Sequence, residues 1–406
     1  MSVAVLLLRA LLLLAAAVAA SVPAEPNRLM QIVVLVRHGD RSAMRSLPID
    51  PHSELLDRVG PAQLLEQGVR QLFRLGVWLR RRYDNQSLLP RWFNTSTMEV
   101  RSTDTDRTLM SAQALLAGLF PGQCAGDGTS MPVCYPVPVH SKPTQTDQLL
   151  KMSSPCAAYQ HRWRQFRARP NGPFKSAVRE FRWLAELARN RTGWPGPDDC
   201  PIKQLWRVED SVNSWQRMGL AMPSWVNGTV REGLAELKRR KFLWKYGELQ
   251  LHSARMGLLV ARLLGGMRLR LEGKTAKALQ VYSAHDSTVA AFLHAFQVFN
   301  GLRPPMAAGI IAELYASGEF RLVYKNSTEQ PAVHQLSIPF CPPPCFLPQL
   351  ESEMRHRGVW AETAQAMCGG GGGDFAEDSQ QAEPLGVVYN FILVIVLSVS
   401  WLPLLY

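Results

Sequence analysis

Two arginines and a histidine directly follow an apolar stretch near the amino-terminal end of the chain. Residues 32–36 are an unbroken, mostly β-branched apolar run, which is typical of a strand buried on both faces of a sheet. Arg37, His38 and Arg41 then stand at the carboxyl end of that strand, where open α/β sheets bind their ligands. Guanidinium groups suit phosphate oxygens, and an imidazole nitrogen can attack phosphorus and carry the phosphoryl group. These residues predict an anion site with a nucleophile in its middle.

Two further segments have the same layout, in which a strand runs into polar residues and then into a helix. Residues 98–100 precede Arg101, and a helical pattern continues to Leu119. Residues 279–283 precede His285 and Asp286. One sheet would bring all three strand ends to the same edge, so we expect these polar residues to meet.

An apolar helix follows the third segment, over residues 289–296. Asp286 or Ser287 is a suitable N-cap for this helix, because both residue types accept hydrogen bonds from the first free backbone N–H groups.

Together the three segments resemble the histidine acid phosphatases, specifically the lysosomal and prostatic acid phosphatase group, from about Met30 to Cys368. The motifs that carry the resemblance are Arg-His-Gly-Asp-Arg at 37–41, Arg-Ser-Thr-Asp-Thr-Asp-Arg-Thr at 101–108 and Tyr-Ser-Ala-His-Asp-Ser-Thr at 282–288. The resemblance implies a phosphate monoesterase in which His38 becomes phosphohistidine and Asp286 protonates the leaving group. It also implies the residues that bind the phosphate, which are Arg37, Arg41, Arg101 and His285.

An acid working range follows from the charge of such a site. A dense positive cluster lowers the pKa of a carboxyl and of an imidazole alike, because it favours the carboxylate and disfavours the imidazolium. The guanidinium groups also supply the positive charge that a metal would bring, so we expect neither a metal nor another cofactor. The competing hypothesis is a cell-surface binding protein that retains the fold with little or no activity. A protein that only binds a partner would not need His38 and Asp286 together.

The pattern of elements predicts an α/β fold, with a mostly parallel sheet, flanking helices and an inserted, smaller helical domain. Residues 28–120 and 250–368 are assigned to the α/β part, and residues 121–249, where strand signals fade, to the mostly helical insertion. Apolar spacing predicts a helix over residues 63–83 and another over 242–271. A late hairpin or edge strand is expected around Gly318.

Both ends of the sequence carry targeting signals. Residues 1–20 are typical of a secretory signal peptide, so the chain is expected to mature in an oxidising compartment, at the cell surface or in the lysosomal membrane. A glycine-rich and acidic spacer, 369–384, precedes a hydrophobic tail, 385–406. Small residues, a polar spacer and an apolar end predict a GPI signal. A transmembrane span is the alternative.

Sequons and cysteines fit the same compartment. The sequons begin at Asn85, Asn94, Asn190, Asn227 and Asn326. The resemblance implies disulfides between Cys156 and Cys368 and between Cys341 and Cys345. Cys124 and Cys134 are candidates for a further bridge, which leaves Cys200 without an assigned partner.

The chain is strongly basic, with a formal net charge of +12. It lacks an interleaved basic and aromatic motif for nucleic acid, so a positive field that attracts phosphorylated substrates is the simpler explanation. The expected partners are therefore a phosphate monoester and, through the tail, a membrane. The resemblance also suggests a homodimer.

Overall fold

The computed structural model describes residues 27–84, 88–121, 124–125, 133–134, 136–152, 155–194, 201–248, 251–274 and 277–368. A mixed sheet lies at its centre, with strands in the order β2-β5-β1-β6-β7-β8, and β9 also pairs with β7. The strands are β1 (Leu29–Arg37), β2 (Met98–Ser102), β5 (Leu279–Ala284), β6 (Gly309–Tyr315), β7 (Glu319–Lys325), β8 (His334–Leu336) and β9 (Cys345–Phe346). The α/β fold class predicted from the sequence is confirmed.

The sheet is less parallel than predicted. Only β2, β5 and β1 run parallel, with β5 in the middle, whereas β6 to β9 are joined in antiparallel pairs. β6 runs antiparallel to β1, and the short connection at Gly318, which has a φ of 83°, makes β7 antiparallel to β6, because a tight turn can only join antiparallel strands. This β6–β7 pair is the hairpin that was predicted around Gly318.

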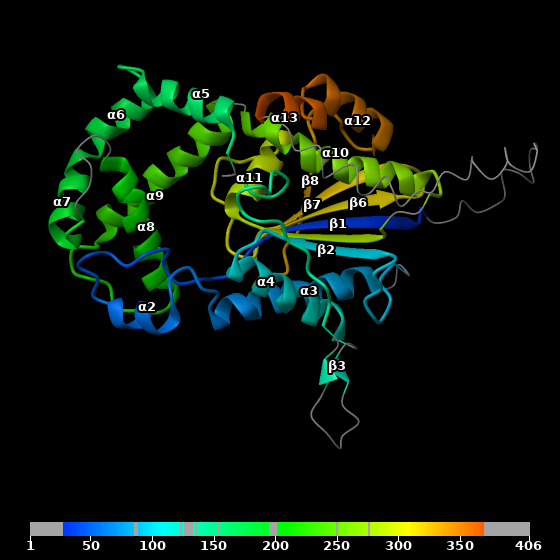
Figure 1. Cartoon of the computed structure of the whole chain (residues 1–406), viewed down its shortest axis with the longest axis horizontal. Helices are drawn as coiled ribbons and strands as arrows, with labels where there is room; N and C mark the ends of the chain where they lie inside the picture. The colour runs from blue at the N-terminus through cyan, green and yellow to red at the C-terminus, as the bar shows by residue number, and fades with distance from the viewer. Residues whose placement is uncertain are drawn as a thin grey trace, which may run out of the picture. The chain divides into compact units, whose positions relative to one another are not determined.

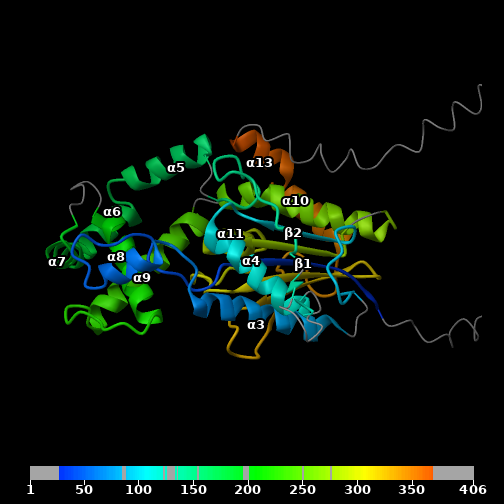
Figure 2. The same cartoon turned by 60° about the horizontal axis from the view of Figure 1, so that its bottom comes forward.

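Helices cover both faces of the sheet (Figures 1 and 2). The helices α3 (Glu66–Tyr83) and α4 (Asp106–Leu119) lie on one face, whereas α10 (Leu251–Leu271), α12 (Leu347–His356) and α13 (Ala361–Cys368) lie on the other. The side chains of β1 from Ile32 to Val36 are all buried, as the apolar run predicts. α3 begins at Glu66 rather than at residue 63, because Leu64 forms a β-bridge with Arg41.

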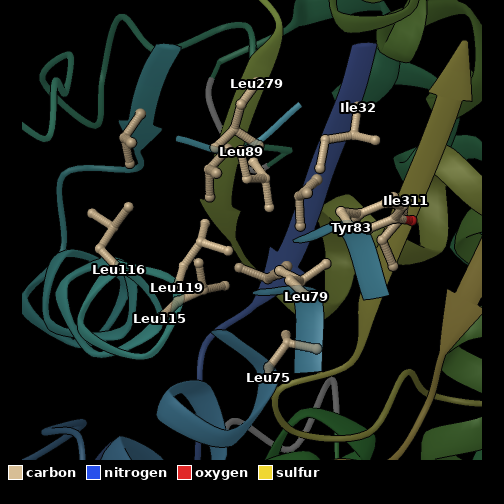
Figure 3. Close-up of a cluster of buried hydrophobic side chains, with 14 of the residues drawn as sticks. Ile32, Leu75, Leu79, Tyr83, Leu89, Leu115, Leu116, Leu119, Leu279 and Ile311 are labelled. Carbon is tan, nitrogen blue, oxygen red and sulfur yellow. The ribbon is translucent and has the colours of Figure 1, made fainter. Parts of the chain in front are cut away.

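The main hydrophobic core fills the space between the sheet and the pair α3 and α4. Figure 3 shows side chains from both helices directed at the strands. Leu79 and Leu119 are fully buried there against Ile32, Leu279 and Ile311. This packing fixes β1, β5 and β2 against α3 and α4, and therefore fixes the positions of the strand ends.

A second core lies among the helices of the middle of the chain. These are α5 (Ala157–Ala168), α6 (Pro173–Glu180), α7 (Arg182–Thr192), α8 (Pro201–Arg217) and α9 (Gly228–Phe242). Their buried aromatic and aliphatic side chains include Phe166, Phe174, Leu184, Leu205, Trp215 and Leu234. The sequence predicted mostly helical structure here, and its division into a separate domain stays a prediction.

Four smaller elements lie between the larger ones. A short helix, α2 (Ser53–Val59), follows the first polar segment, and β3 (Cys124–Ala125) pairs with β4 (Val133–Cys134). The helix predicted over 242–271 is divided, because a π-helix, η3 (Leu243–Glu248), stands between α9 and α10.

Two disulfides tie the described chain together. One joins Cys156, before α5, to Cys368, and the other closes the short loop between Cys341 and Cys345. Cys124 stands opposite Cys134 in the β3–β4 pair, but their side chains lie outside the described residues, as does Cys200. The leader, Asn85, the spacer and the tail also lie outside them. Within the described ranges no helix is long and apolar enough to cross a bilayer.

The crossing of α3 and α4 gives a test of the fold. Gly76 leaves no room for a side chain, because a Cβ atom there would collide with the carbonyl oxygen of Leu115 on α4. We expect Gly76→Ala to lower the free energy of unfolding by about 1–3 kcal/mol, as overpacking does. Urea unfolding followed by circular dichroism measures this change.

Gly265→Ala is the matched control, since Gly265 lies in α10 with open space around its Cβ position. It should be neutral, or stabilising by up to about 1 kcal/mol through helix propensity. Equal effects of the two substitutions would contradict the close α3–α4 crossing.

Candidate active site

His38 stands one residue beyond β1 and is held there by the backbone on both sides. Its N–H donates to the carbonyl of Ala284 at 3.0 Å, and its carbonyl accepts from the N–H of Ala307 at 3.1 Å. The next residue must be small, because a Cβ at Gly39 would collide with the backbone of Gly68 at the start of α3. The side chain of His38 is thus placed by its strand and by the following turn.

The imidazole of His38 is buried and has one nitrogen engaged. Its Nδ1 lies 2.9 Å from the carbonyl oxygen of Gly39, which can only accept a hydrogen bond. The neutral ring therefore carries its proton on Nδ1 and keeps the lone pair on Nε2. Burial first, and then the charge of Arg37, lowers the pKa of His38 well below its usual value. A neutral imidazole with Nε2 free is the form that can act as a nucleophile.

The parallel strands bring the predicted residues of β1 and β5 together. The rings of His38 and His285 meet edge to face, with their centroids 5.6 Å apart. The guanidinium of Arg37 lies 3.6 Å from the carboxylate of Asp286, and the charge of Arg41 also contributes to the low pKa of His38. Arg101 occupies the neighbouring strand β2, opposite Tyr282 of β5.

Arg41 and Arg101 are each oriented by a buried carboxylate that sequence reasoning missed. Asp210, in α8, accepts two hydrogen bonds from Arg41, at 2.6 and 3.1 Å, and Asp147 lies 3.2 Å from Arg101. Burial alone would raise the pKa of Asp210, but the charge of Arg41 outweighs it and holds this pKa well below its usual range. Such pairing fixes the arginine side chains before any ligand binds.

His285 lies among cations. Its Nε2 is 3.0 Å from the hydroxyl of Thr103 and 3.3 Å from the amine of Lys151, and its Nδ1 is 3.4 Å from the guanidinium of Arg107. Burial first, and then the charges of Lys151 and Arg107, lowers the pKa of His285 well below its usual value. Arg107 and Lys151 were not among the predicted site residues, although Arg107 lies within the polar cluster that follows β2.

Asp286 is the first residue of α11 (Asp286–Ala295) and does not cap it. The N-cap is His285, so the predicted cap at Asp286 or Ser287 is wrong. The physical reason is that one carboxylate oxygen, Oδ2, binds the guanidinium of Arg303 at 2.7 Å, and the other accepts from the N–H of Ser287 at 2.8 Å.

Arg303 is a member of the site that sequence reasoning also missed. It connects Asp286 to Glu209, 3.3 Å away, and Glu209 in turn binds the buried amine of Lys238 at 2.7 Å. Burial would raise the pKa of Asp286, but the charges of Arg303 and Arg37 outweigh it and hold the pKa well below its usual range. Arg303 has no strand before it, so strand periodicity gave no signal for it.

A cleft of about 790 Å³ opens beside this cluster. Arg37 and Arg303 lie at its floor, and Arg217, which forms an ion pair with Asp40 at 2.9 Å, lies in its wall. Asn326, the acceptor of a sequon, also lines the cleft. A substrate group can therefore approach Arg37 and Arg303 from solvent.

The chain is similar to several known proteins. The profile of the histidine phosphatase superfamily (branch 2) matches residues 57–335. Lysosomal acid phosphatase of Xenopus laevis is 32% identical over 386 residues, which are 93% of this chain and 87% of that protein. The human lysosomal acid phosphatase is 35% identical over 333 residues, which are 80% of this chain and 77% of that protein.

Solved structures show the same fold at lower identity. A phytase of Hafnia alvei in complex with tartrate superposes with a TM-score of 0.58 at 15% identity, over 84% of this chain and 99% of that one. A phytase of Citrobacter braakii superposes with a TM-score of 0.56 at 14% identity, over 83% and 99%. By sequence over most of its length, and by fold, the chain belongs to branch 2 of the histidine phosphatase superfamily.

Proposed function

We propose that the chain is an acid phosphatase that hydrolyses phosphate monoesters through a phosphohistidine at His38. The observation that carries this proposal is the buried imidazole of His38, whose Nδ1 is engaged by Gly39 and whose Nε2 has no hydrogen-bond partner among the described residues. It lies beside Arg37, His285 and Asp286 at the edge where three parallel strands end. The acid phosphatases that are similar to the chain support the same reaction.

The reaction has two steps. Nε2 of His38 forms a bond to phosphorus while the bond from phosphorus to the ester oxygen breaks, and Asp286 donates its proton to the departing oxygen. Water then attacks the phosphohistidine, with Asp286 now accepting a proton, and phosphate leaves. Arg37, Arg41, Arg101 and His285 bind the phosphoryl oxygens and stabilise the charge that develops on them.

The nucleophile gives the first test. His38→Ala should lower kcat for an aryl phosphate by roughly 10³-fold or more, because no other group would replace the attacking nitrogen. His334→Ala is the control, since His334 is exposed on β8. Both are assayed with EDTA present, which wild type should tolerate because the arginines supply the positive charge. Substantial turnover by folded His38→Ala protein would refute the mechanism.

Arg303 gives a pH test of the acid. Asp286 donates a proton only when it is protonated, so the rate for a poor leaving group falls as pH rises through its pKa. Removing the charge of Arg303 raises this pKa. Arg303→Met should therefore move the descending limb of kcat for an alkyl phosphate to higher pH.

The same profile for an aryl phosphate with a good leaving group should move much less, since that group leaves without a proton. Arg303→Lys, which keeps the charge, and Arg231→Met, at an exposed position of α9, are the controls. If the descending limb for the alkyl phosphate lies at the same pH in Arg303→Met as in the wild type, Asp286 is not the acid.

We further propose that the protein passes through the secretory pathway and is held on the outer face of a membrane. Residues 369–384 and 385–406 have the composition of a GPI signal. Asn94, Asn190 and Asn227 are exposed and accessible to glycosylation. Pairing of two chains, which the family resemblance suggests, stays a prediction.

Treatment of intact cells with a phosphatidylinositol-specific phospholipase should release the enzyme. A chain that lacks residues 385–406 should instead be secreted without treatment. If the enzyme stays on the cells and peptides from residues 387–406 are found in the mature protein, the tail is a transmembrane span.

A further inference from the structure

Three lysines follow one another at the junction of α9 and the π-helix η3. Lys238, Lys241 and Lys245 are spaced by three and four residues, which places them on one side of the helix. The charges of Lys238 and Lys245 each lower the pKa of Lys241, so the three amines lie within electrostatic reach of one another. π-Helices are rare and often occur at functional sites.

Only Lys238 is neutralised by a carboxylate, that of Glu209. In the part of the chain that the structure describes, Lys241 and Lys245 form no ion pair, and their amines contact aromatic rings instead. The amine of Lys241 lies 4.3 Å from the ring centroid of Trp206, and that of Lys245 lies 5.9 Å from the ring centroid of Trp163. Both lysines are partly buried, so their charge is not fully compensated by water.

Trp206 adds a third free donor at the same place. Its indole Nε1 is buried and has no hydrogen-bond acceptor among the described residues. A buried donor without a partner costs free energy, and native proteins rarely retain one without a function. The indole also packs against the second core, so core packing and an unpaired N–H are both properties of this side chain. Two amines and an indole N–H without an acceptor among the described residues are suited to an anion.

This group of donors lies near the start of α11, because η3, which carries Lys245, packs against α11, whose first residue is Asp286. The carboxylate of Asp286 raises the pKa of both Lys241 and Lys245, although burial, the larger effect, lowers each of them. The lysines are therefore close enough to respond to the residue that protonates the ester oxygen. An alcohol part that extends from that oxygen toward η3 would reach these donors.

We propose that Lys241, Lys245 and the indole N–H of Trp206 form a second anion site, which binds another phosphate group carried by the alcohol part of the substrate. The inference rests on the proposed phosphatase function and makes it more specific. The preferred substrates are bisphosphates, from which the enzyme removes one phosphate and releases a monophosphorylated alcohol. A second phosphate supplies about −1.5 to −2 units of charge, enough to compensate the two unpaired amines.

Alkanediol bisphosphates of two to six carbons, compared with alkyl monophosphates of the same length, test this proposal in the full chain. The bisphosphate of the best length should have a KM lower by about tenfold, as charge-assisted hydrogen bonds would give. In the double variant Lys241→Met and Lys245→Met, the ratio of kcat/KM for bisphosphate over monophosphate should fall to about one. The double variant Lys241→Arg and Lys245→Arg, which keeps both charges, should retain most of the wild-type ratio.

Lys203→Met, at an exposed position of α8, is the matched control and should leave the ratio unchanged. A wild-type enzyme that hydrolyses both series without preference would overturn the second site and leave the phosphatase function standing. A wild-type enzyme that hydrolyses neither would refute the phosphatase function. The second site is then tested by calorimetry. Alkane bisphosphonates should bind the wild type more tightly than monophosphonates do, and this difference in affinity must disappear in the double variant Lys241→Met and Lys245→Met.

Discussion

Positive charge around a buried, neutral imidazole is the constraint on which the site depends. His38 can attack phosphorus only while Nε2 holds a lone pair, and burial together with Arg37 keeps the ring unprotonated. The same cations that prevent protonation of His38 attract the phosphate. Because both effects have one source, the arginines cannot be removed without changing the state of the nucleophile.

Carboxylates of the helical region form ion pairs with the cations of the site and hold them in position. Asp210 and Glu209 are neighbours in α8, yet Asp210 binds Arg41 and Glu209 binds Arg303 and Lys238. One helix outside the sheet thus orients cations on both sides of His38. Removal of either carboxylate would leave a buried guanidinium or amine without its partner, which is costly. The middle helices therefore contribute to the chemistry as well as to the second core.

The site residues that could be predicted from the sequence share one property. Arg37, His38, His285 and Asp286 each stand at the carboxyl end of a strand with a clear apolar pattern, so periodicity alone places them at one edge. Arg303 and Asp210 belong to a loop and to a mid-helix position. Their role arises from contacts between segments more than a hundred residues apart in some cases, such as Arg41 with Asp210 at a separation of 169. Local sequence patterns carry no signal for such pairs.

The same distinction explains the errors in the fold. A hairpin was predicted around Gly318, and the β6–β7 pair is antiparallel as a hairpin must be, but β6 also runs antiparallel to β1, and residue types alone do not indicate the direction of a strand. The N-cap prediction failed because Asp286 has the residue type of a cap while its carboxylate binds Arg303. In both cases a long-range or connecting element outweighed local preference.

Direct observation of the covalent intermediate tests the central claim, that His38 carries the phosphoryl group. The enzyme is mixed rapidly with a monoester labelled at phosphorus, quenched in alkali, digested and mapped by mass spectrometry. We predict an alkali-stable, acid-labile label on the peptide that contains His38, formed and lost at rates that support turnover. Turnover with no label on the protein, or with the label on another residue, would contradict the account.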